Sequence, residues 1–166
     1  MIVAIRHWKK EDLPSLVLHA NNFNIAKFMN NGFPHPYTEE QGMKFINYTL
    51  SMNPISIFAI DKDGESIGGI GLHPQQDIMC TNAELGYWLS EQYWGQGILP
   101  NVIPKILDFG FENLNLKRIY ARPFGTNIAS QKVLQKCGFT LEARFDKTIL
   151  KNGEMLDELV YAIRQI

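Results

Sequence analysis

The chain has 166 residues, of which 45% are hydrophobic and 20% charged, and its formal net charge at pH 7 is -1. This length favours one domain over residues 1–166, and the near-neutral charge excludes the strongly basic surface typical of nucleic-acid-binding proteins. No apolar run approaches the ~18 residues of a transmembrane helix, so we expect no membrane partner. The two cysteines, Cys80 and Cys137, lack metal-ligand spacing. They favour a reducing, cytoplasmic setting, and we expect no bound metal.

The first half of the chain is predicted to alternate short strands and helices. In chain order we expect a strand at Ile2–Trp8, a helix at Glu11–Ala20, a polar and aromatic connection at Asn21–Tyr37, a helix from Thr38, and a hairpin of Ile55–Asp61 with Ser66–Leu72. Thr38 can cap its helix, and Gln41 three residues later can reach back to it, as in a capping box.

The second half adds two helices, two single strands and a hairpin. We expect a strand at Ala83–Leu89, a long helix at about Leu99–Leu114, a strand at Arg118–Arg122, a helix at Ile128–Cys137 closed by Gly138, and a hairpin of Thr140–Leu150 with Met155–Ile163. Asn152-Gly153 between the last two strands favours a type I′ turn. The order β-α-α-β-β-β-α-β-α-β-β predicts an α/β (α+β) fold, with a mixed, mostly antiparallel seven-stranded sheet and helices on both faces.

Two glycines, Gly95 and Gly97, lie between the strand that ends at Leu89 and the long helix. A strand that runs into a Gly-x-Gly loop opening a helix directs backbone N–H groups and a positive helix end at one point. This arrangement is typical of a phosphate or pyrophosphate cradle. Glycines in pairs also serve simply to allow a turn, so the loop alone leaves both interpretations open.

Five stretches make the interpretation more specific. They are Phe33–Glu40, Glu84–Leu89, Trp94–Gly97, Asn127–Ser130 and Cys137–Glu142. In this order and spacing they resemble the GNAT superfamily of acetyl-CoA-dependent N-acetyltransferases, and within it the ribosomal-protein N-terminal acetyltransferase (RimJ/RimL-like) branch. The resemblance covers nearly the whole chain. It implies a GNAT-like fold, acetyl-CoA as cosubstrate, and a primary amine as acceptor, most simply the N-terminal amine of a protein or peptide.

The family motif Gln/Arg-x-x-Gly-x-Gly/Ala fits the chain in two registers. Gln92–Gly97 matches its letters, whereas a register that begins at Trp94 keeps the branch's spacing from the preceding strand, and we prefer the second. In that register Leu99 replaces a small residue and Pro100 replaces a common hydrogen-bond donor. Asn127 can serve simply as the N-cap of the helix that follows it. By resemblance, the residues that bind coenzyme A are Leu89, Trp94, Gly95, Gln96, Gly97, Ile98, Leu99, Asn127 and Ser130.

Three residues are candidates for proton transfer. In matching relatives the serine at Ser130, or a nearby tyrosine, protonates the departing thiolate; otherwise Ser130 is an ordinary first-turn helix residue. Glu84 shares a strand face with Trp88, and an apolar setting there would allow the carboxylate to act as general base through a water. It could equally be a solvent-facing strand carboxylate. His73 is the alternative base, because imidazole titrates near neutral pH.

The sequence says least about the site that binds the acceptor amine. His35 and Tyr37 are expected to shape its entrance. A small amine such as a polyamine, an aminosugar or an amino acid is the alternative acceptor, although the absence of carboxylates from Asn21–Tyr37 counts against a polyamine. Leu99 and Pro100 keep open a third hypothesis, a non-catalytic domain that binds coenzyme A. The sequence leaves the oligomeric state open, with a homodimer among the options.

Overall fold

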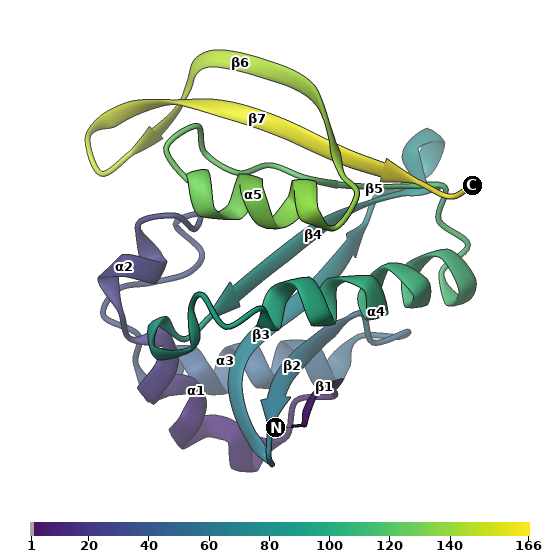
Figure 1. The fold of residues 1–166 in the computed structure, drawn as a ribbon. Coiled ribbons are helices and arrows are strands. Elements are labelled where there is room, and N and C mark those ends of the chain that lie inside the picture. The colour runs from purple at the N-terminus through teal and green to yellow at the C-terminus, as the bar shows by residue number, and fades with distance from the viewer. Residues whose placement is uncertain (1) are drawn as a thin grey trace. The chain divides into compact units, whose positions relative to one another are not determined.

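The structure, a computed structural model, describes residues 2–166. Within this range seven strands form one sheet in the order β1-β2-β3-β4-β5-β7-β6 (Figure 1). The strands are β1 (Val3–Arg6), β2 (Ile57–Lys62), β3 (Glu65–Pro74), β4 (Asn82–Leu89), β5 (Arg118–Ala121), β6 (Thr140–Lys151) and β7 (Glu154–Arg164). The α-helices are α1 (Leu13–Ala20), α2 (Phe23–Ala26), α3 (Glu39–Ser51), α4 (Ile98–Asn113) and α5 (Ile128–Lys136). Short 3-10 helices η1, η2 and η3 occupy Lys10–Asp12, Asp77–Met79 and Glu91–Tyr93. No helix in the described range is long and apolar enough to cross a membrane.

The strand pairing confirms a mixed, mostly antiparallel sheet. The pairs β1/β2, β2/β3, β5/β7 and β6/β7 are antiparallel, whereas β4/β5 is parallel. The expected order of strands and α-helices is also confirmed, with one added α-helix and three short 3-10 helices. The segment Asn21–Tyr37, expected to be a plain connection, contains α2, because the side chain of Asn22 accepts a hydrogen bond from the backbone N–H of Asn24 and so caps the helix.

The chain divides into two compact units, which are described separately below. The first comprises the chain up to Gly71 together with Tyr87–Val102, and the second comprises Leu72–Gly86 and Ile103–Ile166. A single domain over the whole length stays a prediction.

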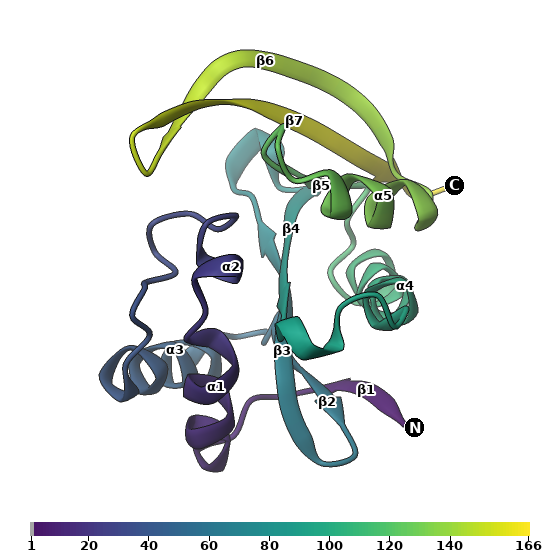
Figure 2. The ribbon, with the colours of Figure 1, turned by 60° about the vertical axis from the view of Figure 1, so that its left-hand side comes forward.

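The core of the first unit lies where α1 and α3 run side by side (Figure 2). Leu16 of α1 and Ile46 of α3 are fully buried, as is nearly all of Trp8, which follows β1. Burying a side chain of this size contributes about 1.5–3 kcal/mol. The expected cap of α3 is confirmed, since Thr38 Oγ1 accepts a hydrogen bond from the N–H of Gln41 at 3.3 Å.

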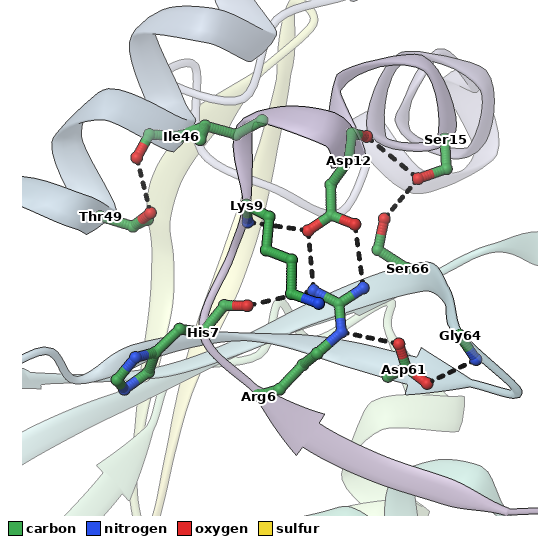
Figure 3. A network of polar contacts seen from close by, with 10 residues as sticks. All are labelled: Arg6, His7, Lys9, Asp12, Ser15, Ile46, Thr49, Asp61, Gly64 and Ser66. Carbon is green, nitrogen blue, oxygen red and sulfur yellow. Dashed lines mark hydrogen bonds and ion pairs between the residues drawn. The ribbon is translucent and has the colours of Figure 1, made fainter.

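A polar network beside this core fixes the start of the chain (Figure 3). The guanidinium of Arg6 donates two hydrogen bonds to the Asp12 carboxylate, at 2.8 and 2.9 Å, and a third to Asp61 at 2.7 Å. Burial alone would raise the pKa of Asp12, but the bonds from Arg6 and from the Lys9 N–H hold it below its ordinary value. The Asp61 carboxylate also accepts from the N–H of Gly64 in the β2–β3 turn. The network therefore links β1, η1 and β2.

The second unit carries the long β6–β7 hairpin, with α5 beside it (Figures 1 and 2). Asn152 and Gly153 both have positive φ, 50° and 80°, which confirms the expected type I′ turn. Gly138 ends α5 with a φ of 89°. Its N–H donates to the Gln135 carbonyl, and the N–H of Phe139 donates to the Leu134 carbonyl. This pair of bonds is a Schellman motif, so the expected helix end is confirmed.

Candidate functional site

The loop between η3 and α4 has the backbone conformation that its glycines suggested. Gly95 and Gly97 have φ of 74° and 75°, in the left-handed region that side-chain-bearing residues rarely adopt. A Cβ placed on either glycine would have no atom within 4 Å. The two glycines are therefore needed for the turn, and the space in front of them is open to a ligand.

Helix α4 begins at the end of this loop, at Ile98. The first backbone N–H groups of a helix have no partner inside it, and the helix dipole adds about half a positive charge there. Ile98 and Leu99 supply such N–H groups, whereas Pro100 has none. The side chain of Ile98 is buried, which anchors this end of the helix. The open turn and the helix end together fit an anionic group such as a pyrophosphate.

Pro104 lies inside α4. The helix starts at Ile98, so this proline lies beyond the first turn, in which a proline would be tolerated. Pro104 therefore leaves the carbonyl four residues earlier, that of Pro100, without its helical donor, which loosens the helix near the loop.

Trp94 lies back on the end of β4. Its indole Nε1–H donates to the carbonyl of Leu89 at 2.8 Å, while 44% of the side chain stays exposed. The Leu89 carbonyl therefore accepts one hydrogen bond from the segment that follows the strand. The contact of Leu89 with coenzyme A that the resemblance implies stays a prediction.

Strands β4 and β5 pair only over their first residues. The parallel register joins Asn82 to Arg118, Ala83 to Ile119, and Glu84 to Tyr120, while β4 continues to Leu89.

Glu84 is held by a cation rather than by an apolar surface. Its two carboxylate oxygens accept from Arg122 Nε and Nη2 at 3.1 and 3.2 Å. Arg122 also approaches Glu158 at 3.7 Å. Trp88 packs against Phe33, with ring centroids 5.7 Å apart. The apolar setting that we expected for Glu84 is therefore wrong, since its carboxylate makes a two-pronged contact with a guanidinium. Its role as base stays a prediction.

His73, the alternative base, ends β3 near Glu84. Its Nε2 lies 3.5 Å from the position that a Cβ on Gly86 would take. Removal of water by the surrounding protein lowers the pKa of His73, and the Glu84 charge opposes this effect only in part. A lowered pKa favours the neutral ring, the form that can accept a proton. Tyr120 lies in the same group, and burial, followed by the Glu84 charge, raises its pKa.

Asn127 caps α5, as the sequence suggested. Its Oδ1 accepts from the N–H of Ser130 at 3.2 Å, so the two residues form one local motif. The additional contacts with coenzyme A that the resemblance implies for them stay predictions. The nearby hydroxyl of Tyr161 is buried and lies 3.4 Å from Gln135 Nε2.

The two acceptor-site candidates have different environments. His35 is exposed, and its ring meets that of Phe23 edge-on with centroids 5.8 Å apart. Tyr37 is only 5% exposed and packs 5.3 Å from the Phe33 ring. Burial raises the pKa of Tyr37 to about 12. The side chain of Tyr37 belongs to the core of the first unit, and its expected role at the acceptor site stays a prediction. The role of His35 stays a prediction.

Sequence reasoning missed several polar partners. Arg122 binds Glu84 across 38 positions of the chain, and Asn22, Asn24 and His19 bind residues just after β4. The asparagine-rich run Asn21–Asn24 was a local sign of such contacts, but it did not indicate the partner. Within residues 2–166, no group of His, Cys, Asp or Glu side chains is arranged to hold a metal ion.

Comparison with known proteins identifies the family. Residues 3–140 match the model described as an acetyltransferase (GNAT) domain. The chain is 29% identical over 159 residues to the uncharacterized N-acetyltransferase YnaD of Bacillus subtilis (strain 168), covering 96% of this chain and 91% of that protein. It is 31% identical over 102 residues to the ribosomal-protein-serine acetyltransferase of Escherichia coli (strain K12), covering 61% of this chain and 54% of that protein.

A solved structure shows the same fold. RimL, a ribosomal L7/L12 alpha-N-protein acetyltransferase in complex with coenzyme A, superposes with a TM-score of 0.84 at 21% identity, covering 98% of this chain and 93% of that one. Since the family model spans well over half of its length, the chain belongs to the GNAT family of acetyl-CoA-dependent N-acetyltransferases.

Proposed function

We propose that this N-acetyltransferase acts on the N-terminal amine of a protein or peptide. The observation that carries the proposal is the similarity to a ribosomal-protein-serine acetyltransferase, supported by the structural likeness to RimL. The segment Asn21–Tyr37, which contains no carboxylate, supports a neutral acceptor site over one built for a polycation. Fold alone does not choose an acceptor.

For the cosubstrate, we assign the pyrophosphate to the N–H groups of Gly95, Gln96, Gly97 and Ile98. Trp94 and Leu99 flank this loop on either side. Acetyl-CoA supplies the acetyl group as a reactive thioester. The N–H of Leu89 is assigned to the thioester carbonyl, where a donor is worth most as negative charge develops. Asn127 is assigned to the pantetheine arm.

For the proton transfers, the acceptor amine must lose a proton to become a nucleophile, and the departing thiolate must gain one. We assign the first role to His73 or Glu84, which lie together in the second unit, with the lowered pKa of His73 in its favour. We assign the second role to Ser130.

The acceptor is tested by comparing kcat/KM across a panel of amines with acetyl-CoA as donor. We expect a peptide with a free α-amine to exceed spermidine, glucosamine and free amino acids. The same peptide with a blocked N-terminus and one internal lysine is the matched control. Faster turnover of the blocked peptide or of a small amine would refute this acceptor assignment, whereas the assignment to the family would still hold.

Replacing Ser130 with alanine should lower kcat by roughly 10- to 10³-fold and change coenzyme A affinity little, because the main loss is the protonation of the thiolate. Alanine is also a better helix former than serine, so α5 should persist. Steady-state kinetics and calorimetry separate the two effects. An unchanged kcat would return Ser130 to a purely structural role in the first turn of α5.

The two candidate bases are separated by pH profiles of kcat/KM. If His73 is the base, His73→Gln removes the acidic limb, whereas Glu84→Gln keeps the limb and moves it to lower pH. The limb moves to lower pH because the negative charge of Glu84 raises the pKa of His73, so removing that carboxylate lowers the pKa of His73 further. If Glu84 is the base, Glu84→Gln removes the limb itself and lowers the plateau. If the acidic limb is retained at its original pH in both variants, neither residue is the general base.

A further inference from the structure

The segment Ser90–Trp94 joins β4 to the glycine loop, and side chains from α1 and α2 hold it from one side. All of these residues belong to the first unit. One contact is buried and the other is exposed, and they fall on consecutive residues, Ser90 and Glu91. Neither contact was visible in the sequence, and no step proposed above uses them.

The buried contact runs through His19 of α1. Its Nδ1 lies 2.9 Å from Ser90 Oγ, and its Nε2 lies 2.8 Å from Glu65 Oε1 at the start of β3. His19 and Ser90 are each 5% exposed. The N–H of Ser90 also donates to the carbonyl of Ile67 in β3. Ser90 is thus fixed by both its backbone and its side chain.

The exposed contact joins α2 to Glu91. Asn22 Nδ2 donates to Glu91 Oε2 at 2.6 Å, and Asn24 Nδ2 donates to Oε1 at 3.1 Å and to Oε2 at 3.3 Å. These side-chain bonds, that of Asn22 first, lower the pKa of Glu91. The side-chain oxygen of Asn22 accepts from the N–H of Asn24 and caps α2, so one residue both caps the helix and binds the segment.

Gly95 and Gly97 make the following loop intrinsically permissive, and a flexible loop loses entropy when it closes on a ligand. A fixed preceding segment reduces that loss. We propose that Asn22, Asn24 and His19 are positioning residues that act through Glu91 and Ser90 to hold the glycine loop ready for coenzyme A. The inference rests on the assignment of the pyrophosphate to that loop.

The exposed contact offers the sharper test, because Glu91 is accessible and its loss should hardly affect folding. Glu91→Ala and Asn24→Ala should each raise the Kd for coenzyme A about 3- to 10-fold and raise KM similarly, with kcat within about 2-fold. The double variant should bind coenzyme A no more weakly than the worse single variant, because the two substitutions remove the same interaction. Glu91→Gln, which keeps an acceptor oxygen, should restore most of the affinity.

Glu40→Ala is the matched control. It removes another exposed carboxylate, one that pairs with Lys44 on its own helix α3, and should leave the Kd unchanged. Gly97→Val separates a failure of the positioning role from a failure of the pyrophosphate assignment. If Gly97→Val weakens binding and Glu91→Ala does not, the positioning role is overturned. Additive losses in the double variant would also overturn it. If Gly97→Val binds normally, the loop assignment itself fails.

Discussion

Gly97→Val should weaken coenzyme A binding by about 10²- to 10⁴-fold, because hydrogen bonds from backbone N–H groups to a charged phosphate contribute about 1.5–3 kcal/mol each and about two would be lost. Two effects of the valine side chain combine to cause this loss of affinity. A β-branched residue resists the φ of 75° at Gly97, and its side chain would occupy the open space in front of the turn. Calorimetric titration with coenzyme A measures the loss directly.

The matched control for this variant is Gly153→Val in the β6–β7 turn. Gly153 has a φ of 80°, and a Cβ there also meets no atom within 4 Å, so the backbone strain is the same. Both variants should lose similar thermal stability, but only Gly97→Val should lose affinity. Equal affinity losses in the two would show that strain, and not the phosphate contact, is responsible.

The parts of this structure that the sequence predicts well are those set by neighbours in the chain. The Thr38 and Asn127 caps, the Gly138 helix end and the Asn152-Gly153 turn each depend on hydrogen bonds or φ angles within a few residues. The same holds for the glycine loop, where the residue type alone indicates the backbone conformation. These local signals placed every strand and all but one of the α-helices.

The parts that sequence reasoning missed depend on partners far along the chain. Glu84 was expected beside an apolar surface, but its partner, Arg122, reaches it only because β4 and β5 pair in parallel. The indole N–H of Trp94 turns back to the Leu89 carbonyl, and Tyr37 is buried in a core cluster. The binding roles expected of these two residues stay predictions. Their contacts depend on packing that their neighbours in the sequence do not reveal.

Replacing Arg6 with methionine should destabilise the fold by about 3–5 kcal/mol, because it leaves the Asp12 carboxylate buried without its partner. The side chains of Arg6, Asp12 and Asp61 are only 21%, 9% and 14% exposed, so solvent screens their interaction weakly (Figure 3). Urea unfolding measures the free-energy difference. Lys44→Met, which breaks the exposed pair with Glu40, should cost at most about 0.5 kcal/mol.

The loss of unfolding free energy caused by Arg6→Met should become smaller as the pH falls. In the native chain the pKa of Asp12 is lowered, so its stabilising contribution is complete above the unfolded pKa of ~3.9 and is lost as pH falls through the folded value. In the variant, burial is the largest effect on Asp12 and is opposed only by the Lys9 hydrogen bond and charge. The pKa of Asp12 should therefore rise above its value in the native chain, so the folded variant is penalised more at neutral pH than in acid. The free-energy gap between the two proteins should therefore narrow from about pH 7 to about pH 4. A gap that stays constant over this range would show that lost packing of the Arg6 stem, and not the unpaired carboxylate, causes the destabilisation.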